Sequence, residues 1–79
     1  MGVSMKNLRI KDDFIKLGQA LKLAGIVDSG VDAKIAIQDG QVKVNGEVDL
    51  RRGRKLMEGD EVSYHGETFK VSKSAGVNE

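Results

Sequence analysis

The sequence predicts an α+β fold in which two tandem short helices pack on a small, mainly antiparallel β-sheet. Between residues 14 and 37, apolar residues recur at spacings of three and four, which indicates helices with one buried face. From residue 41 onward, apolar and polar residues alternate between glycine-containing turns, which indicates strands. The helices are therefore expected in the first half of the chain and most of the sheet in the second.

A short strand is expected at residues 5–10, before the first helix. Leu8 and Ile10 fall on one face of an extended chain, while Asn7 and Arg9 fall on the other. The sheet should therefore include one strand from the N-terminal part of the chain.

The first helix is expected to begin after Asp12 and Asp13, because aspartate side chains accept hydrogen bonds from the free amides of a first helical turn. Gly25 is expected to end it, since glycine often follows the last helical residue. The apolar stripe of this helix is formed by Phe14, Leu17, Leu21 and Ala24.

A second helix is expected after Ser29, whose side chain can accept from an early helical amide, with Asp32 three residues later. Asp39-Gly40 is a natural stop for this helix. Its broad apolar surface is formed by Val31, Ala33, Ile35, Ala36 and Ile37.

The β half is expected to begin with a hairpin. Val42 and Val44 fall on one face of a strand and Lys43 on the other, and Asn45-Gly46 is the strongest short hairpin signal. A second hairpin should follow the turn at residues 58–60 and reverse around Gly66. The expected core of the fold is Leu8, Ile10, Phe14, Leu17, Leu21, Ile35, Ile37, Val42, Val44, Leu56, Val62, Phe69 and Val71.

With 79 residues the chain has room for one domain. We expect this domain at residues 5–72, with flexible segments at residues 1–4 and 73–79, which are rich in small and polar residues. The chain has no cysteine, so neither a disulfide nor a zinc-binding thiolate can brace the fold. No apolar run is long enough to span a membrane and no signal-peptide pattern is present, so we expect a cytoplasmic protein.

Positive charge is concentrated in residues 51–55, which we call the basic segment. Arg51, Arg52, Arg54 and Lys55 supply four positive charges, so the net charge of +1 would be −3 without them. Gly53 lets the backbone turn within the segment, so that several cations can point at one ligand. By composition alone, the segment could be a solvated loop or a binding site for an anion.

No set of residues predicts catalysis. His65 is the single histidine, and we interpret it as a turn residue beside Gly66, because no nucleophile and orienting partner accompany it. The acidic residues lack the spacing of metal ligands, and there is no glycine-rich nucleotide loop. We therefore expect no enzyme activity, no metal, no cofactor and no small-molecule substrate.

The motifs of the chain resemble the S4 RNA-binding domain, a module named for a protein of the small ribosomal subunit. The resemblance spans about residues 14–64. It includes the sequence of the first helix at residues 16–25, the hairpin from Gly40 to Asn45-Gly46 and the turn Glu58-Gly59-Asp60. It implies the αL fold, in which two helices and a hairpin form an RNA-docking surface. The sequence at Leu17-Gly18-Gln19 and in the basic segment is most similar to the sequences of short bacterial proteins in which this domain stands alone.

The candidate RNA-contacting positions are Lys16, Ser29, Gly30, Lys34 and Lys43, together with Arg51, Arg52, Arg54 and Lys55 of the basic segment. The resemblance supports Lys16 and the basic segment, whereas Lys34 could join Ser29 and the Gly30 amide in a phosphate site at the start of the second helix. For the lysines the alternative is a solvated surface position, and for Ser29 it is the helix cap alone. Lys16 stands where many members have arginine, and Gly30 stands where an arginine often follows the serine, so the helices offer fewer phosphate contacts here. We therefore expect the basic segment to carry more of the affinity. Four phosphate contacts there would give a log-log salt slope of about −3.6.

The expected ligand is structured RNA, in particular ribosomal RNA or a ribosome-assembly particle, bound by a monomer. The chain has only three aromatic residues, and Phe14 and Phe69 are expected in the core, so no platform is available for stacking unpaired bases. Two alternatives remain. The basic segment could dock on an acidic protein partner, and a ubiquitin-like sulfur carrier would need a C-terminal diglycine where this chain has Gly76-Val77-Asn78-Glu79.

Overall fold

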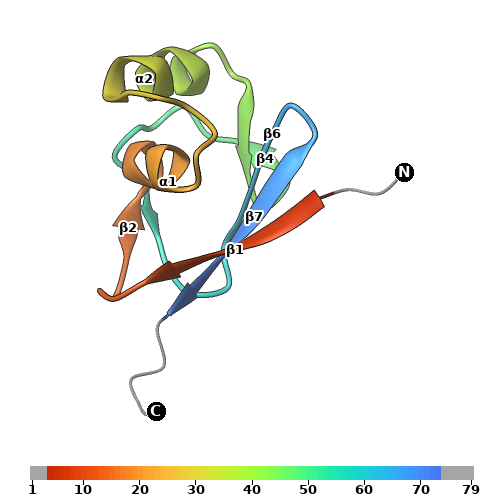
Figure 1. The fold of residues 1–79 in the computed structure, drawn as a ribbon. Helices are drawn as coiled ribbons and strands as arrows, with labels where there is room; N and C mark the ends of the chain where they lie inside the picture. Colours follow the sequence, from red (N-terminus) through yellow and green to blue (C-terminus); the bar gives the residue numbers. More distant parts are fainter. Residues whose placement is uncertain (1–3, 74–79) are drawn as a thin grey trace.

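Two short helices cover a twisted sheet in the computed structural model, which describes residues 4–73 (Figure 1). The main sheet has five strands in the order β1-β7-β6-β3-β4. Its strands are β1 (Ser4–Ile10), β3 (Val42–Val44), β4 (Glu47–Val48), β6 (Glu61–Tyr64) and β7 (Glu67–Lys73). The remaining elements are β2 (Ile15–Lys16), α1 (Leu17–Leu23), α2 (Gly30–Gln38) and β5 (Lys55–Leu56), of which β2 and β5 form a separate antiparallel pair.

The sheet is mainly antiparallel, as expected, except at β1. This strand pairs with β7 in parallel, from Ser4 opposite Glu67 to Ile10 opposite Lys73. Ser4 and Lys73 thus belong to strands, one residue outside the expected domain at each end. The rest of the segments expected to be flexible lies at residues 1–3 and 74–79, outside the described residues.

The expected start of the first helix is wrong. α1 begins at Leu17, and the residue before it, Lys16, has an extended backbone and makes no side-chain cap. Ile15 and Lys16 pair with β5 instead, so a long-range strand contact takes the residues that local spacing assigned to a helix. The predicted end is correct, because Ala24 caps the helix immediately before Gly25.

The second helix agrees with the prediction at both ends. The amide of Asp32 donates to Ser29 Oγ at 3.2 Å, and Asp39 caps the C-terminus. Gly40 follows with a φ of 76°, a conformation that side chains disfavour. The core face of α2 is formed by its small residues and Ile37, whereas Val31 and Ile35 point to solvent.

The core contains most of the expected residues. Phe14 and Ile35 are exceptions, with 39% and 59% of their surface exposed, because Phe14 precedes α1 and Ile35 lies on the outer side of α2. Three buried alanines were not expected in the core. The observed core is Leu8, Ile10, Leu17, Ala20, Leu21, Ala33, Ala36, Ile37, Val42, Val44, Leu56, Val62, Phe69 and Val71.

Both predicted hairpins are present. Asn45 and Gly46 have positive φ values of 53° and 87°, and His65 and Gly66 have 47° and 81°. Positive φ at both central residues is the signature of the two-residue turn that suits twisted strands. His65 is therefore a turn residue, as expected, and its Nε2 lies 2.8 Å from Gln41 Oε1.

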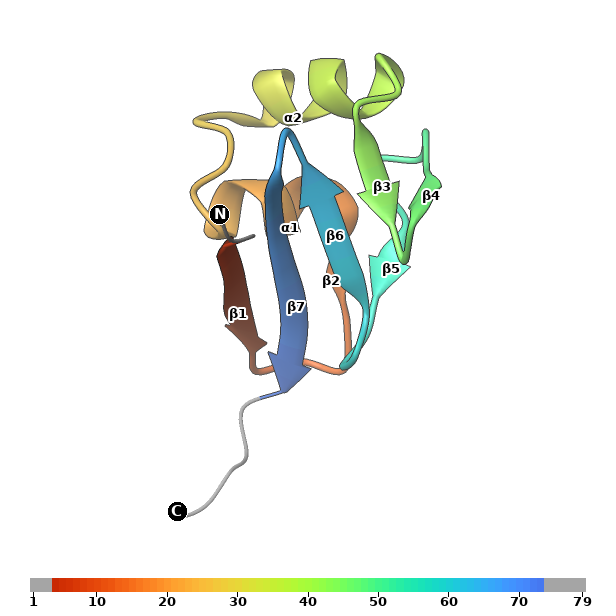
Figure 2. The same cartoon turned by 90° about the vertical axis from the view of Figure 1, so that its right-hand side faces the viewer.

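The arrangement places the basic segment beside the helices. In the view of Figure 2, α1, β2 and β5 lie behind the main sheet, and α2 crosses its upper end. The pairing of β2 with β5 brings the end of the basic segment to the start of α1. Within residues 4–73, neither helix is long and apolar enough to cross a membrane.

Candidate nucleic-acid interface

The backbone of the basic segment caps the first turn of α1. The Leu17 amide donates to the Arg54 carbonyl at 2.8 Å, and the Gly18 amide donates to the Arg52 carbonyl at 3.0 Å. First-turn amides have no partner within their own helix. The carbonyls of the basic segment therefore accept from the first amides of α1, which have no side-chain cap at Lys16.

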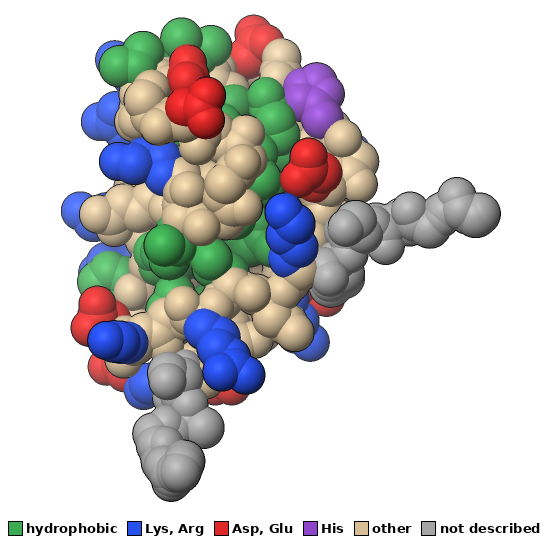
Figure 3. Space-filling model, in the orientation of Figure 1, with side chains coloured by type: hydrophobic (Ala, Val, Ile, Leu, Met, Phe, Trp, Pro, Cys, Tyr) green, Lys and Arg blue, Asp and Glu red, His purple; other side chains and the backbone are tan. Residues whose placement is uncertain are grey.

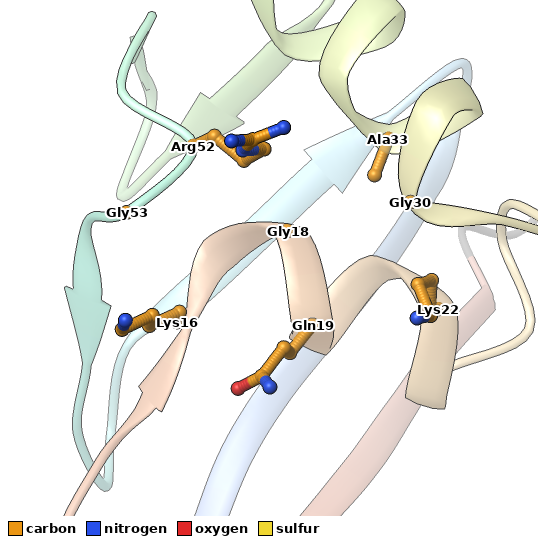
Figure 4. Close-up of a pocket in the computed structure, with 8 residues that line it drawn as sticks. All are labelled: Lys16, Gly18, Gln19, Lys22, Gly30, Ala33, Arg52 and Gly53. Carbon is orange, nitrogen blue, oxygen red and sulfur yellow. The ribbon is translucent and has the colours of Figure 1, made fainter.

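The side chain of Arg52 lies close over α1. A Cβ atom added at Gly18 would lie 2.8 Å from Arg52 Cγ, which is shorter than real Cβ contacts. Glycine at position 18 thus permits the approach of the segment to the helix. Figure 4 shows the Arg52 side chain extending from the loop above Gly18 toward Ala33 on α2.

Three cations from separate segments line one depression between α1, α2 and the basic segment. We call this depression of about 330 Å³ the basic hollow, and its lining is Lys16, Gly18, Gln19, Lys22, Gly30, Ala33, Arg52 and Gly53. Lys16 and Lys22 lie at opposite ends of α1 in Figure 4, with Arg52 above them. Among the described residues, the lining holds these cations and no carboxylate. Such a site favours an anion.

Positive side chains also gather along one edge of the molecule. Figure 3 shows Lys and Arg along the left edge of the molecule, over α2, α1 and β2. Lys34 is exposed on α2 but does not line the hollow. Lys43 alternates with the buried Val42 and Val44, so it projects from the sheet face that lies away from the core. The predicted site residues are thus divided between two faces.

Asp49 binds two arginines of the basic segment. Its side chain is almost fully buried, and Oδ1 accepts from the Arg51 amide at 2.9 Å and from Arg51 Nε at 3.1 Å. Oδ2 accepts from Arg51 Nη2 at 3.0 Å and from Arg54 Nη1 at 2.6 Å. The Arg51 guanidinium holds the pKa of Asp49 well below its ordinary value, although burial acts in the opposite direction.

Lys55 is engaged in another way. Its Nζ lies 4.8 Å from the centroid of the Phe14 ring, in the geometry of a cation–π contact. The basic segment therefore does not present four equivalent cations.

Of the expected site residues, Lys16, Gly30 and Arg52 meet in the basic hollow. Ser29 is occupied as the cap of α2. Lys22 and Asp49 were missed by the sequence reasoning. Lys22 lies four residues after Gly18, which places both on one face of α1. Asp49 lies two residues before Arg51, and an acid beside a run of cations was the available signal.

The described residues provide no candidate metal site. No group of three or more His, Cys, Asp or Glu side chains within residues 4–73 could hold a metal ion. The contact of His65 with Gln41 lies in an exposed turn away from the basic hollow.

Comparisons with known proteins converge on one family. The family model described as "S4 domain" matches residues 8–72. The "Putative RNA-binding protein YbcJ" of Escherichia coli (strain K12) is 44% identical over 61 residues, which cover 77% of this chain and 87% of that protein. The "Probable ribosome maturation protein RlbA" of Bacillus subtilis (strain 168) is 48% identical over 59 residues, covering 75% and 83%.

A solved structure has the same fold. The solution structure of YbcJ from E. coli, described as revealing an αL motif involved in RNA binding, superposes with a TM-score of 0.64 and 39% identity. The match covers 91% of this chain and 90% of that one. These proteins are named for RNA binding or ribosome maturation and not for an enzyme activity.

Proposed function

Because the chain belongs to the S4 domain family, we propose that it binds structured RNA through the basic hollow and the adjoining basic segment. The family resemblance, the αL fold and the non-enzymatic character expected from the sequence are confirmed by these matches. The relatives cover most of this chain and are similar to it in length. The RNA-binding domain is proposed at residues 5–72, which includes the whole of the matched range.

The observation that carries the proposal is the set of cations in the basic hollow. Lys16, Lys22 and Arg52 come from three segments and face one depression that lacks a carboxylate among the described residues. Phosphate groups supply most of the attraction between proteins and nucleic acids, because each contact releases counterions. Of the predicted contacts, we propose that Lys16, Gly30 and Arg52 bind RNA together in the basic hollow. Lys43 lies on the other face of the sheet and does not take part.

The proposed mode of binding is recognition of backbone shape. Phe69 is buried, the Phe14 ring has Lys55 Nζ 4.8 Å from its centroid, and the Tyr64 ring packs edge-on against His65 with centroids 4.3 Å apart. These are all the aromatic residues of the chain, so successive unpaired bases have no stacking platform. Contacts to phosphates and sugars of a folded RNA therefore fit the surface better than reading of a single strand.

The proposed ligand is ribosomal RNA or a ribosome-assembly particle. The B. subtilis relative, which is named as a ribosome maturation protein, supports this narrower proposal. A cytoplasmic location and action as a monomer, without a small-molecule substrate, belong to the same proposal.

Filter binding of bacterial ribosomal RNA at graded salt tests the proposal. We expect Arg52→Gln to weaken binding about tenfold and to reduce the magnitude of the log-log salt slope by about 0.9, because one phosphate contact is lost. Lys43→Gln is the matched control, since it removes one positive charge from the opposite sheet face. It should change the affinity less than twofold.

Two results would contradict the proposal. One is absence of binding to ribosomal RNA and to purified ribosomal subunits at low salt. The other is an equal loss for Arg52→Gln and Lys43→Gln, which would indicate that only total charge matters. A pull-down from nuclease-treated lysate separates the remaining alternative, because direct docking on an acidic protein would survive removal of RNA.

A further inference from the structure

We propose that Asp49 is a positioning residue for RNA binding, which holds Arg51 and Arg54 as supports of the loop and thereby directs Arg52 into the basic hollow. This inference rests on the proposed function of the hollow. It assigns different roles to the three arginines of the basic segment. Among the described residues, Arg51 and Arg54 form ion pairs with Asp49, and Arg52 lines the hollow.

Asp49 is itself held in place by the sheet. Its amide donates to the Val42 carbonyl at 3.2 Å, just beyond β4 on the edge beside β3. Its side chain is 5% exposed; Oδ1 accepts from Arg51, and Oδ2 accepts from both Arg51 and Arg54. A carboxylate so enclosed acts as a fixed point for the side chains that bind it, because moving them would leave a buried charge without partners.

The two arginines bound to Asp49 stand on either side of Arg52 in the chain. The Arg54 amide donates to the Arg51 carbonyl at 3.2 Å, so the backbone turns between them. That turn presents the carbonyls of Arg52 and Arg54 to the Gly18 and Leu17 amides of α1. The loop is thus held from the sheet by side chains and from the helix by its backbone, and Arg52 projects between these two attachments.

Charge and position predict opposite effects of Asp49. As a negative charge near RNA, Asp49 repels phosphate, so its removal should strengthen binding. As a support of the loop, it places Arg52, so its removal should weaken binding. The sign of the change in affinity therefore separates the two roles.

The test is binding of bacterial ribosomal RNA to Asp49→Asn, with Glu47→Gln as the matched control. Both substitutions remove one negative charge with little change of size, and Glu47 is an exposed residue of the same edge strand. We expect Asp49→Asn to bind about tenfold more weakly, since bonds to charged groups are among the strong ones. Glu47→Gln should bind as well as the parent or slightly better. Equal or tighter binding by Asp49→Asn would overturn the proposal.

A double variant shows whether Asp49 acts through Arg52. When Arg52→Gln is already present, Asp49→Asn should cost less than a further twofold, because the side chain that it positions has been removed. A tenfold loss in both backgrounds would indicate a general structural role and would overturn the proposal. If Arg52→Gln alone binds like the parent, then the proposed function of the hollow fails; if only Asp49→Asn binds like the parent, then the positioning role alone fails.

Folding of the variants is followed by circular dichroism at the temperature of the binding assay. If Asp49→Asn does not fold, Asp49→Glu replaces it, since the charge is kept and the carboxylate is displaced by one methylene. Affinity should then fall about threefold with no change in net charge. An unchanged affinity in a folded Asp49→Glu would count against positioning.

Discussion

The two helices begin in different ways. α2 is capped by its own chain, where Ser29 Oγ accepts from the Asp32 amide. α1 has no side-chain cap, and the carbonyls of Arg52 and Arg54, far along the sequence, accept from its first amides. The cap of α2 is formed without the basic segment, although Gly30 and Ala33 of this helix line the basic hollow, whereas the start of α1 is completed by the segment that we propose to contact RNA. Stability and RNA binding should therefore be coupled at α1 and separate at α2.

The largest effect on stability is expected from Asp49→Asn, which removes the support of the segment that caps α1. We expect the free energy of unfolding to fall by about 2 kcal/mol, because charge-assisted hydrogen bonds to Arg51 and Arg54 are lost. For a domain of this size, the melting temperature should fall by about 8–16 °C at neutral pH. Thermal unfolding measures this fall in melting temperature. A fall no larger than that of Glu47→Gln would contradict the prediction.

The difference in melting temperature between the parent and Asp49→Asn should depend on pH. Folding lowers the pKa of Asp49 from its ordinary value of 3.8, so folding favours the ionised form. The stabilisation is then fully present above the ordinary pKa and is lost as the pH falls through the lowered one. The difference in melting temperature between the parent and Asp49→Asn should be constant from about pH 5 to pH 8 and should shrink below about pH 4. A difference that shrinks near pH 6 would exclude Asp49 as its source.

A smaller effect is expected at the start of α2. Ser29→Ala removes the cap and should lower the free energy of unfolding by about 1 kcal/mol. RNA affinity should change less than twofold, because the Ser29 hydroxyl is occupied by the cap and does not line the basic hollow. Thermal unfolding and filter binding on the same variant test both statements. A large loss of affinity at unchanged stability would mean that Ser29 contacts RNA directly.

The smallest effects on stability should differ between two glycines, Gly30 and Gly18. Gly30→Ala in the first turn of α2 meets no atom within 4 Å and should stabilise the protein by about 0.5 kcal/mol. Gly18→Ala in α1 should show no such gain, since its Cβ would meet Arg52 Cγ at 2.8 Å. It should also weaken RNA binding by displacing Arg52. Equal stabilisation by both substitutions would show that Arg52 can move away from a Cβ at position 18 without loss of stability.

The same contrast explains how much the sequence could predict. Ser29, Asp39-Gly40 and Asn45-Gly46 act through neighbours in the chain, so both ends of α2 and the first hairpin were predicted correctly. The start of α1 depends on β2 pairing with β5, and no local signal at Asp12 or Asp13 reports that contact. Local propensity was overridden there by tertiary structure.

The candidate site was predictable in part for the same reason. The charge of the basic segment and its family position indicated where an anion could bind, but not how its cations differ. Arg51 and Arg54 face Asp49, Lys55 covers Phe14, and Arg52 reaches the hollow. These differences arise from burial and from contacts between elements, which spacing in the chain does not encode. Lys22 was missed because a lysine on an outward face is usually only solvated.

The parallel pairing of β1 with β7 sets an order on folding during synthesis. Of the described strands, β1 leaves the ribosome first and its partner β7 last, separated by a delay on the order of seconds at ordinary translation rates. Until β7 is made, Leu8 and Ile10 lack the strand with which they pair in the fold, so the core that they belong to cannot be completed. The core can therefore form only after translation has passed Lys73. A nascent chain that is interrupted earlier is expected to remain a substrate for chaperones and proteases.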